Sequence, residues 1–187
     1  PYALSKYHGE LSVFHWSKVY GLSVNSIRIF NAYGTRVKTS GAYGAVFGVF
    51  FKQKLSNQPL TIVGDGNQSR DFVYVTDVAN AFYLASETEI DSQIFNLGAS
   101  NPQSILKLAK LIGGPIEFLP KRPGEPDCTH ANITKITNLL KWSPKTTFED
   151  GLELMLKEID KWKDAPLWNR QTIDKETKNW FKYMSKK

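Results

Sequence analysis

The sequence predicts an α/β fold, and three observations support this prediction. Stretches with apolar residues at helical spacing alternate along the chain with short runs of β-branched and aromatic residues. Glycine, asparagine or proline stops most of these short runs, as expected for strands that end in turns. The chain has 187 residues, of which 41% are apolar, so it is the size of one domain and can bury a real core.

The first third of the chain contains a long helix, a strand and a second helix. Residues 3–20 predict a helix with two apolar stripes, which we expect to pack on a sheet and on a second neighbour. Gly21 stands where glycine commonly ends a helix. Residues 23–29 predict a strand because of their β-branched content. A polar loop over 35–41 leads to an aromatic helix over 42–55.

The remaining elements continue the alternation. We expect Thr76 or Asp77 to cap one helix, and Asn101 with Pro102 to start the next. The expected strands cover residues 60–63, 70–75, 94–97 and 116–119. The expected helices cover residues 76–86, 101–112, 133–141, 147–162 and 172–184.

Most of the net charge of +6 lies at the end of the chain. Residues 157–187 hold nine Lys or Arg against five Asp or Glu. A basic tail can bind nucleic acid, and a steep salt dependence of binding would be its mark. Here the charges alternate in sign with Trp and Leu between them, which favours a solvated amphipathic helix. We therefore expect no nucleic-acid partner.

Composition and residue spacing also bear on the cellular compartment, on membrane crossing and on metal binding. The single cysteine, Cys128, excludes an internal disulfide and fits a reducing compartment. The longest apolar run has ten residues, which is too short to cross a bilayer, and no leader opens the chain. His8, His15 and His130 are scattered, without metal-ligand spacing. We expect a cytoplasmic protein that binds neither membrane nor metal.

The first ten residues carry the chemistry that matters most. Tyr2 and Lys6 are four apart, so on a helix both project from one face, one turn apart. A fixed ammonium favours phenolate over phenol and lowers a pKa that starts near about 10. The phenol can then act as a general base on a hydroxyl. Taken alone, the pair also fits an ordinary amphipathic helix.

Four further motifs follow in a fixed order, and together they narrow the interpretation. They are Arg28-Ile-Phe-Asn31-Ala-Tyr33-Gly34, Leu60-Thr-Ile-Val63-Gly-Asp-Gly66, Arg70-Asp71-Phe72-Val-Tyr74-Val75-x-Asp77 and Arg122-Pro-Gly-Glu125-Pro-Asp127. With Tyr2-x-x-x-Lys6-x-x-Gly9-Glu10, they make residues 1–160 resemble the extended short-chain dehydrogenase/reductase family. Within it, the chain resembles the NAD-dependent nucleotide-sugar epimerase/dehydratase branch, which includes UDP-glucose 4-epimerase.

The resemblance implies a division of the chain. Residues 1–35 would be the C-terminal remnant of an NAD(P)-binding Rossmann-like domain, with the Tyr-Lys helix and the strand after it. Residues 36–165 would form mainly the small α/β nucleotide-sugar-binding domain, with interleaved Rossmann elements. Residues 166–187 would be a basic helical extension outside the resemblance.

The resemblance further implies that the Gly-rich, NAD-binding half of the family is absent from this chain. Gly41, Gly44 and Gly48 do not replace it, because a polar loop rather than a buried strand precedes them. The Ser or Thr that assists the catalytic Tyr is absent too. We therefore expect these 187 residues to be inactive alone, and their exposed apolar edges to favour a homodimer or other self-association.

The roles of the site residues follow from the resemblance as well. Tyr2 would take the proton of the sugar C4 hydroxyl while NAD takes the hydride, which gives a 4-keto intermediate, and Lys6 would hold the nicotinamide ribose. Phe30 would approach the nicotinamide. The substrate-binding residues would be Asn31, Arg70 and Arg122 at the phosphates, Glu125 at the ribose, and Thr61 and Val63 at the base.

The choice of reaction stays open among members of one family. We favour 4-epimerisation of a UDP-hexose. The alternatives are 4,6-dehydration of a dTDP- or UDP-hexose, decarboxylation of UDP-glucuronate, and a non-catalytic module that only binds nucleotide sugars. Asn132 stands where the family often has Asp, and Ile29 stands where some epimerases have an aromatic residue. Both departures leave the reaction undecided.

Overall fold

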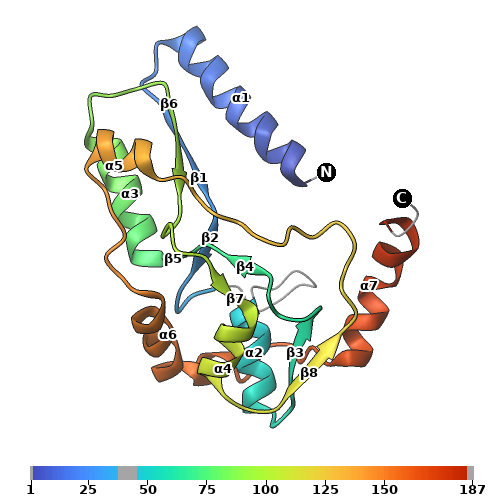
Figure 1. Cartoon of the computed structure of the whole chain (residues 1–187). Coiled ribbons are helices and arrows are strands. Elements are labelled where there is room, and N and C mark those ends of the chain that lie inside the picture. The colour runs from blue at the N-terminus through green and yellow to red at the C-terminus, as the bar shows by residue number, and fades with distance from the viewer. Residues whose placement is uncertain (1, 38–45, 185–187) are drawn as a thin grey trace.

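The computed structural model describes residues 2–37 and 46–184 (Figure 1). The parts of the expected loop and second helix that fall within 38–45 lie outside the described residues. The helices are α1 (Tyr2–Tyr20), α2 (Val46–Leu55), α3 (Val75–Glu87), α4 (Ile105–Ile112), α5 (Thr134–Leu140), α6 (Phe148–Lys157), a 3₁₀ helix (Ile159–Trp162) and α7 (Arg170–Met184). The strands are β1 (Asn25–Ile29), β2 (Asn31–Tyr33), β3 (Leu60–Val63), β4 (Ser69–Arg70), β5 (Phe72–Tyr74), β6 (Gln93–Leu97), β7 (Gln103–Ser104) and β8 (Ile116–Leu119).

The strands form four pairs, and three of these are parallel. β1 pairs with β6, β2 with β5 and β3 with β8 in parallel, whereas β4 pairs with β7 antiparallel. Parallel strands need crossover connections, which the helices supply. The expected α/β class is therefore confirmed.

The chain changes partner strands at Phe30. The Phe30 N–H donates to the carbonyl of Leu97 at 2.9 Å, continuing the β1–β6 pair, and the Asn31 N–H donates to the carbonyl of Asp71 at 3.2 Å, opening the β2–β5 pair. Two predicted site residues thus lie where one strand pair gives way to the next.

Two apolar cores hold the helices to these strands. The larger core is aromatic and lies among α2, α6, β2 and β5, where Tyr33 stacks on Phe47 with 4.8 Å between ring centroids. The smaller core packs α3 and α5 against β1 and β6 around Phe95 and Trp142. Tyr33 and Phe95 are almost fully buried, so large side chains pack at the β2–β5 and β1–β6 pairs.

Three expectations about the central elements were wrong. The strand predicted over 70–75 divides at Asp71, because β4 pairs with β7 while β5 pairs with β2. The helix predicted from 101 begins only at Ile105, because Gln103 and Ser104 pair with β4, and the hydroxyl of Ser104 caps the helix by accepting from the Lys107 N–H at 3.1 Å. Neither Thr76 nor Asp77 caps α3, which begins after Tyr74 without a side-chain cap.

The expectation that α1 buries both apolar stripes was also wrong for the residues that the structure describes. In Figure 1, α1 lies outside β1 at the edge of the fold. Leu4, Tyr7, Leu11 and Trp16 are each about half exposed, and only Ser17 of this helix is buried. On α3, Phe82 and Tyr83 are exposed as well. Self-association through such surfaces stays a prediction.

Within the described ranges, no helix combines the length and the apolar character that a membrane crossing requires.

Candidate functional site

One cavity of about 480 Å³ brings together all six residues that were predicted to bind substrate. Its wall is built from β2, α2, β3, β4, the loop after β8 and the C-terminal helix α7, segments that are far apart in the sequence. The predicted residues that line it are Asn31, Thr61, Val63, Arg70, Arg122 and Glu125.

Arg70 is held in place by backbone carbonyls. Its Nη1 donates to the carbonyl oxygens of Ser69 at 2.8 Å and of Pro126 at 2.9 Å. Among the described residues no carboxylate pairs with this guanidinium, so its charge is not neutralised by the protein. A guanidinium that is oriented in this way and faces a cavity is suited to bind an anion.

Arg122 and Glu125 contact each other across a tight loop. Arg122 Nη1 donates to Glu125 Oε1 at 3.0 Å, and both side chains are mostly buried. Between them Gly124 has a φ of +78°, a conformation that glycine adopts readily. The resemblance assigned the two residues to different parts of the ligand, whereas here they form one ion pair at the cavity wall.

Asn31 is oriented by a hydrogen bond from Thr129. The Thr129 hydroxyl donates to Asn31 Oδ1 at 2.9 Å and itself accepts from the Asp71 N–H at 3.1 Å. Because the oxygen of the Asn31 amide is occupied, its NH₂ group remains as a donor, which is the role expected for it at a phosphate.

A buried glutamine that we did not predict connects Thr61 to the C-terminal segment. Gln53 Nε2 donates to Thr61 Oγ1 at 2.7 Å and to the carbonyl of Trp168 at 2.6 Å, while Gln53 Oε1 accepts from the Thr61 N–H at 3.1 Å. Gln53 is fully buried, so all of these bonds are shielded from water. A polar residue in the last turn of an aromatic helix was the signal that could have found it.

Tyr2 and Lys6 lie in a different cavity. They line a space of about 510 Å³ between α1 and β1, together with Gly9, Glu10 and the residues of β1. Lys6 Nζ is 5.5 Å from the centroid of the Tyr2 ring, so the helix does bring the ammonium to the phenol as predicted. The two residues are not in the cavity of the other six.

Phe30 lines neither cavity. Its neighbours connect the two spaces, because Ile29 lines the Tyr2–Lys6 cavity and Asn31 lines the Arg70–Arg122 cavity. The cavities therefore adjoin the same short segment of chain.

A bidentate ion pair holds α1 against β1. Arg28 donates through Nε to Glu10 Oε2 at 2.9 Å and through Nη2 to Glu10 Oε1 at 2.6 Å, and Ser26 Oγ donates to Oε2 at 2.8 Å. The hydrogen bonds from Arg28, with that from Ser26, lower the pKa of Glu10, against the opposing effect of burial. Glu10 thus sets how far Tyr2 and Lys6 stand from β1.

We expect acid to release α1 before the core unfolds. A carboxyl with a lowered pKa stabilises the folded state above its ordinary pKa and loses this effect as pH falls through the lowered value. Hydrogen exchange of the α1 amides should therefore accelerate on acidification while β5 and β6 stay protected. In Glu10→Gln, α1 should exchange fast already at neutral pH. Loss of protection in α1 and the core at one common pH would contradict the prediction.

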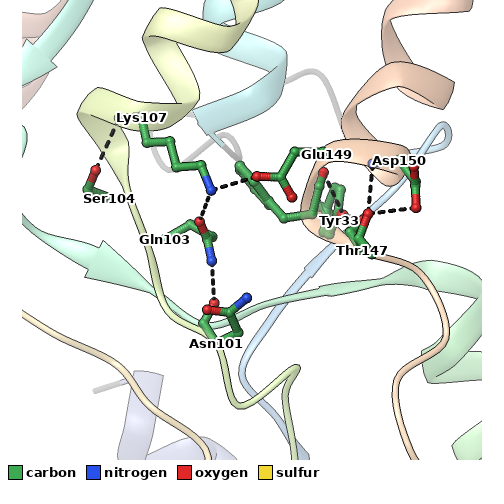
Figure 2. Close-up of polar contacts among 9 residues, drawn as sticks. Tyr33, Asn101, Gln103, Ser104, Lys107, Thr147, Glu149 and Asp150 are labelled. Carbon is green, nitrogen blue, oxygen red and sulfur yellow. Dashed lines mark hydrogen bonds and ion pairs between the residues drawn. The ribbon is translucent and has the colours of Figure 1, made fainter.

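A second network of polar contacts connects α4, β7 and α6. Figure 2 shows Lys107 between Glu149, at 2.6 Å, and Gln103, whose Oε1 accepts from Lys107 Nζ at 2.6 Å. The amide of Gln103 donates in turn to the carbonyl of Asn101 at 2.9 Å. The Tyr33 hydroxyl donates to the carbonyl of Thr147 at 3.3 Å, and burial raises its pKa. These contacts join α4, α6 and the strands β2 and β7.

Within the described ranges, no group of three His, Cys, Asp or Glu side chains is placed to hold a metal ion.

Comparison with known proteins identifies relatives of the chain. The family model described as NAD dependent epimerase/dehydratase family matches residues 1–98. An uncharacterized UDP-glucose epimerase of Bacillus subtilis is 33% identical over 159 residues, which cover 81% of this chain and 49% of that protein. UDP-glucuronic acid decarboxylase 4 of Arabidopsis thaliana is 36% identical over 144 residues, which cover 74% of this chain and 32% of that protein.

A solved structure shows the same fold. The crystal structure of UDP-glucuronic acid 4-epimerase from Bacillus cereus, in complex with UDP-glucuronic acid and NAD, is 34% identical and superposes with a TM-score of 0.77. The match covers 86% of this chain and 52% of that one. The chain spans about half the length of the curated relatives it matches, or less.

Proposed function

The chain belongs to the NAD-dependent epimerase/dehydratase family, and from this we propose that it supplies the nucleotide-sugar site and the catalytic tyrosine for 4-epimerisation of a UDP-hexose. The observation that carries the proposal is the Arg70–Arg122 cavity, which joins two guanidinium groups, an amide donor and the two carboxylates of Glu125 and Glu176. We assign it mainly to residues 36–165, with residues 1–35 supplying the Tyr-Lys helix.

The cavity offers the charge that a diphosphate needs. Arg70 has no carboxylate partner among the described residues, and the Asn31 amide keeps its NH₂ donor. Arg122 can move from Glu125 to a phosphate oxygen, because charge-assisted bonds to phosphate are at least as strong. Glu125 is then left to accept from ribose hydroxyls.

Residues of α1 would act on the reacting sugar. The Tyr2 phenol would accept the proton of the C4 hydroxyl and later return it, acting as general base and then general acid. The ammonium of Lys6 lies 5.5 Å from the centroid of the Tyr2 ring, beside the group that would exchange this proton. Bound NAD supplies the hydride acceptor that this chemistry requires.

The residues present fit one end of that cofactor. The Tyr2–Lys6 cavity offers an ammonium donor suited to ribose hydroxyls. Phe30 directly follows Ile29, which lines this cavity. Among the described residues, however, no strand-to-helix turn carries the paired glycines that cradle a pyrophosphate. We therefore propose that these 187 residues by themselves bind NAD weakly and do not turn over.

Two observations favour other candidates within the family. A UDP-glucuronic acid decarboxylase is among the relatives, so decarboxylation is the second candidate reaction. Tyr2 is 75% exposed and lies outside the Arg70–Arg122 cavity, which suits a module that binds nucleotide sugars without catalysis. Measuring the product formed from each UDP-sugar, in an assembly that binds NAD, separates these candidates.

Calorimetric titration of the 187-residue chain with UDP, dTDP and NAD tests the proposal. We expect UDP to bind, and Arg122→Ala to weaken it by roughly 10- to 100-fold, the range for losing a charge-assisted hydrogen bond. The matched control is Lys121→Ala, because Lys121 is the neighbouring cation but pairs with Asp127 and lies outside the cavity. Equal UDP affinity of Arg122→Ala and the unchanged chain would contradict the proposed site. Tight NAD binding would contradict the proposed dependence on further cofactor-binding residues.

A further inference from the structure

The C-terminal helix α7 turns one face toward the Arg70–Arg122 cavity. Ile173, Glu176 and Thr177 line that cavity, at helical positions i, i+3 and i+4. At i+7, the indole N–H of Trp180 donates to the carbonyl of Pro123 at 2.8 Å, within the loop that carries Arg122. One side of the amphipathic C-terminal helix therefore faces the site.

The basic side chains of α7 lie away from this face. Lys175, Lys178 and Lys182 are exposed, and none of them lines the cavity. The charge of these three lysines is thus solvated, whereas Arg170 at the start of the helix and Trp180 near its end contact the rest of the chain.

The segment that leads into α7 is attached at both of its sides. The carbonyl of Trp168 accepts from Gln53, the same amide that binds Thr61, and Trp168 is among the residues that line the cavity. Arg170 Nη1 lies 3.0 Å from Glu117 Oε1, which fastens the start of α7 to β8. Contacts to α2, β8 and the Arg122 loop therefore hold residues 168–180 in place.

This wall differs in chemistry from the rest of the cavity. Arg70, Arg122 and Asn31 offer donors for an anion, whereas Trp168 and Ile173, with Phe50 of α2, offer an apolar and partly aromatic surface beside the polar Glu176 and Thr177. A nucleobase has two flat apolar faces, which suit such a surface, while a hexose carries hydroxyls on most of its carbons. The Asn31 side of the site adjoins the Tyr2–Lys6 cavity, so the sugar belongs there and the nucleoside belongs elsewhere.

We infer that Trp168 and Ile173 form a binding wall for the base of the nucleotide, so that the C-terminal segment is part of the ligand site. The inference rests on the proposed function, since it takes the ligand to be a nucleotide sugar. It assigns a role to residues that lie beyond the motifs on which the family resemblance depends.

Comparing UDP with inorganic pyrophosphate tests this wall, because pyrophosphate has the phosphates but lacks the base. In the 187-residue chain, Ile173→Ala and Trp168→Leu should each weaken UDP binding by about 5- to 30-fold, as expected for lost apolar contact. Their affinity for pyrophosphate should stay within about twofold of the unchanged chain. Arg122→Ala should weaken both ligands.

The matched control is Lys175→Ala, on an exposed side of the same helix, which should leave both affinities unchanged. Circular dichroism of each variant checks that the fold is kept; Ile173→Ala truncates a side chain that is only partly buried, so it tests the wall even where Trp168→Leu unfolds. Unchanged UDP affinity in Ile173→Ala would overturn the inference, while weakening by Arg122→Ala would still support the proposed function.

A parallel loss of UDP and pyrophosphate binding in Ile173→Ala would also overturn the inference, because α7 would then act only by supporting the Arg122 loop. Absence of UDP binding to the unchanged chain would overturn the proposed function, and this inference with it.

Discussion

Replacing Asp71 by Asn is expected to lower the free energy of unfolding by about 3 kcal/mol, the largest effect that we expect from a change of one atom. Asp71 is fully buried, and both of its carboxylate oxygens accept from backbone N–H groups. Oδ1 accepts from Ala99 at 2.8 Å and Asn101 at 3.4 Å, and Oδ2 accepts from Ser100 at 3.1 Å and Ala131 at 2.8 Å. Whichever way the new amide turns, its NH₂ group faces two donors.

Thermal and urea denaturation of Asp71→Asn measure this loss. For a domain of this size, about 3 kcal/mol corresponds to a fall of the melting temperature by roughly 6–12 °C. Asp91→Asn is the control, because the Asp91 side chain is exposed and its carboxylate has no buried donors to satisfy. A melting temperature of Asp71→Asn within about 2 °C of the unchanged chain would show that the carboxylate is not the anchor described here.

The backbone hydrogen bonds of Asp71 also position residues of the candidate site. Its carbonyl accepts from the Asn31 N–H, and its own N–H donates to Thr129, which orients the Asn31 amide. Arg70 is the preceding residue in the chain. One buried carboxylate therefore fixes the backbone from which two of the predicted phosphate ligands project.

Gly151→Ala is expected to destabilise the fold by about 2 kcal/mol, although alanine favours a helix over glycine by about 1 kcal/mol. The added Cβ would lie 2.2 Å from the hydroxyl oxygen of Tyr33, and 2.8 Å and 2.9 Å from two of its ring carbons. Tyr33 cannot move aside easily, since it stacks on Phe47 and contacts Phe72 and Tyr74 edge-on. Overpacking of this kind costs about 3 kcal/mol at the upper end of its usual range, which outweighs the gain in helix propensity.

A double variant identifies the cause. Tyr33→Phe removes the atom nearest to the new methyl group, so combining it with Gly151→Ala should recover part of the lost stability. Gly9→Ala is the control, because nothing lies within 4 Å of a Cβ added there and the change should not destabilise α1. Strictly additive effects of Gly151→Ala and Tyr33→Phe would argue against the steric explanation.

Much of the fold could be predicted from the sequence, and two of the wrong predictions share one origin. The ends of β3 and β8 follow from β-branched runs next to glycine or proline, and the structure has both strands as predicted. The strand expected over 70–75 was wrong because its two halves pair with different partners, which no local pattern reveals. The start of α4 was displaced for the same reason, since Gln103 and Ser104 are needed by β4.

By itself, the sequence determined the α/β class, the helical spacing that brings Lys6 to Tyr2, and the motifs whose six residues converge on one cavity. These features depend on spacing within a few residues, or on motifs long enough to be recognised. Only the tertiary structure decided that Asp71 anchors four N–H groups, that Gln53 links Thr61 to Trp168, and that α7 lines the cavity. Each of these is a contact between segments distant in the chain, and a buried polar group takes whichever partner the packed fold brings within hydrogen-bonding distance.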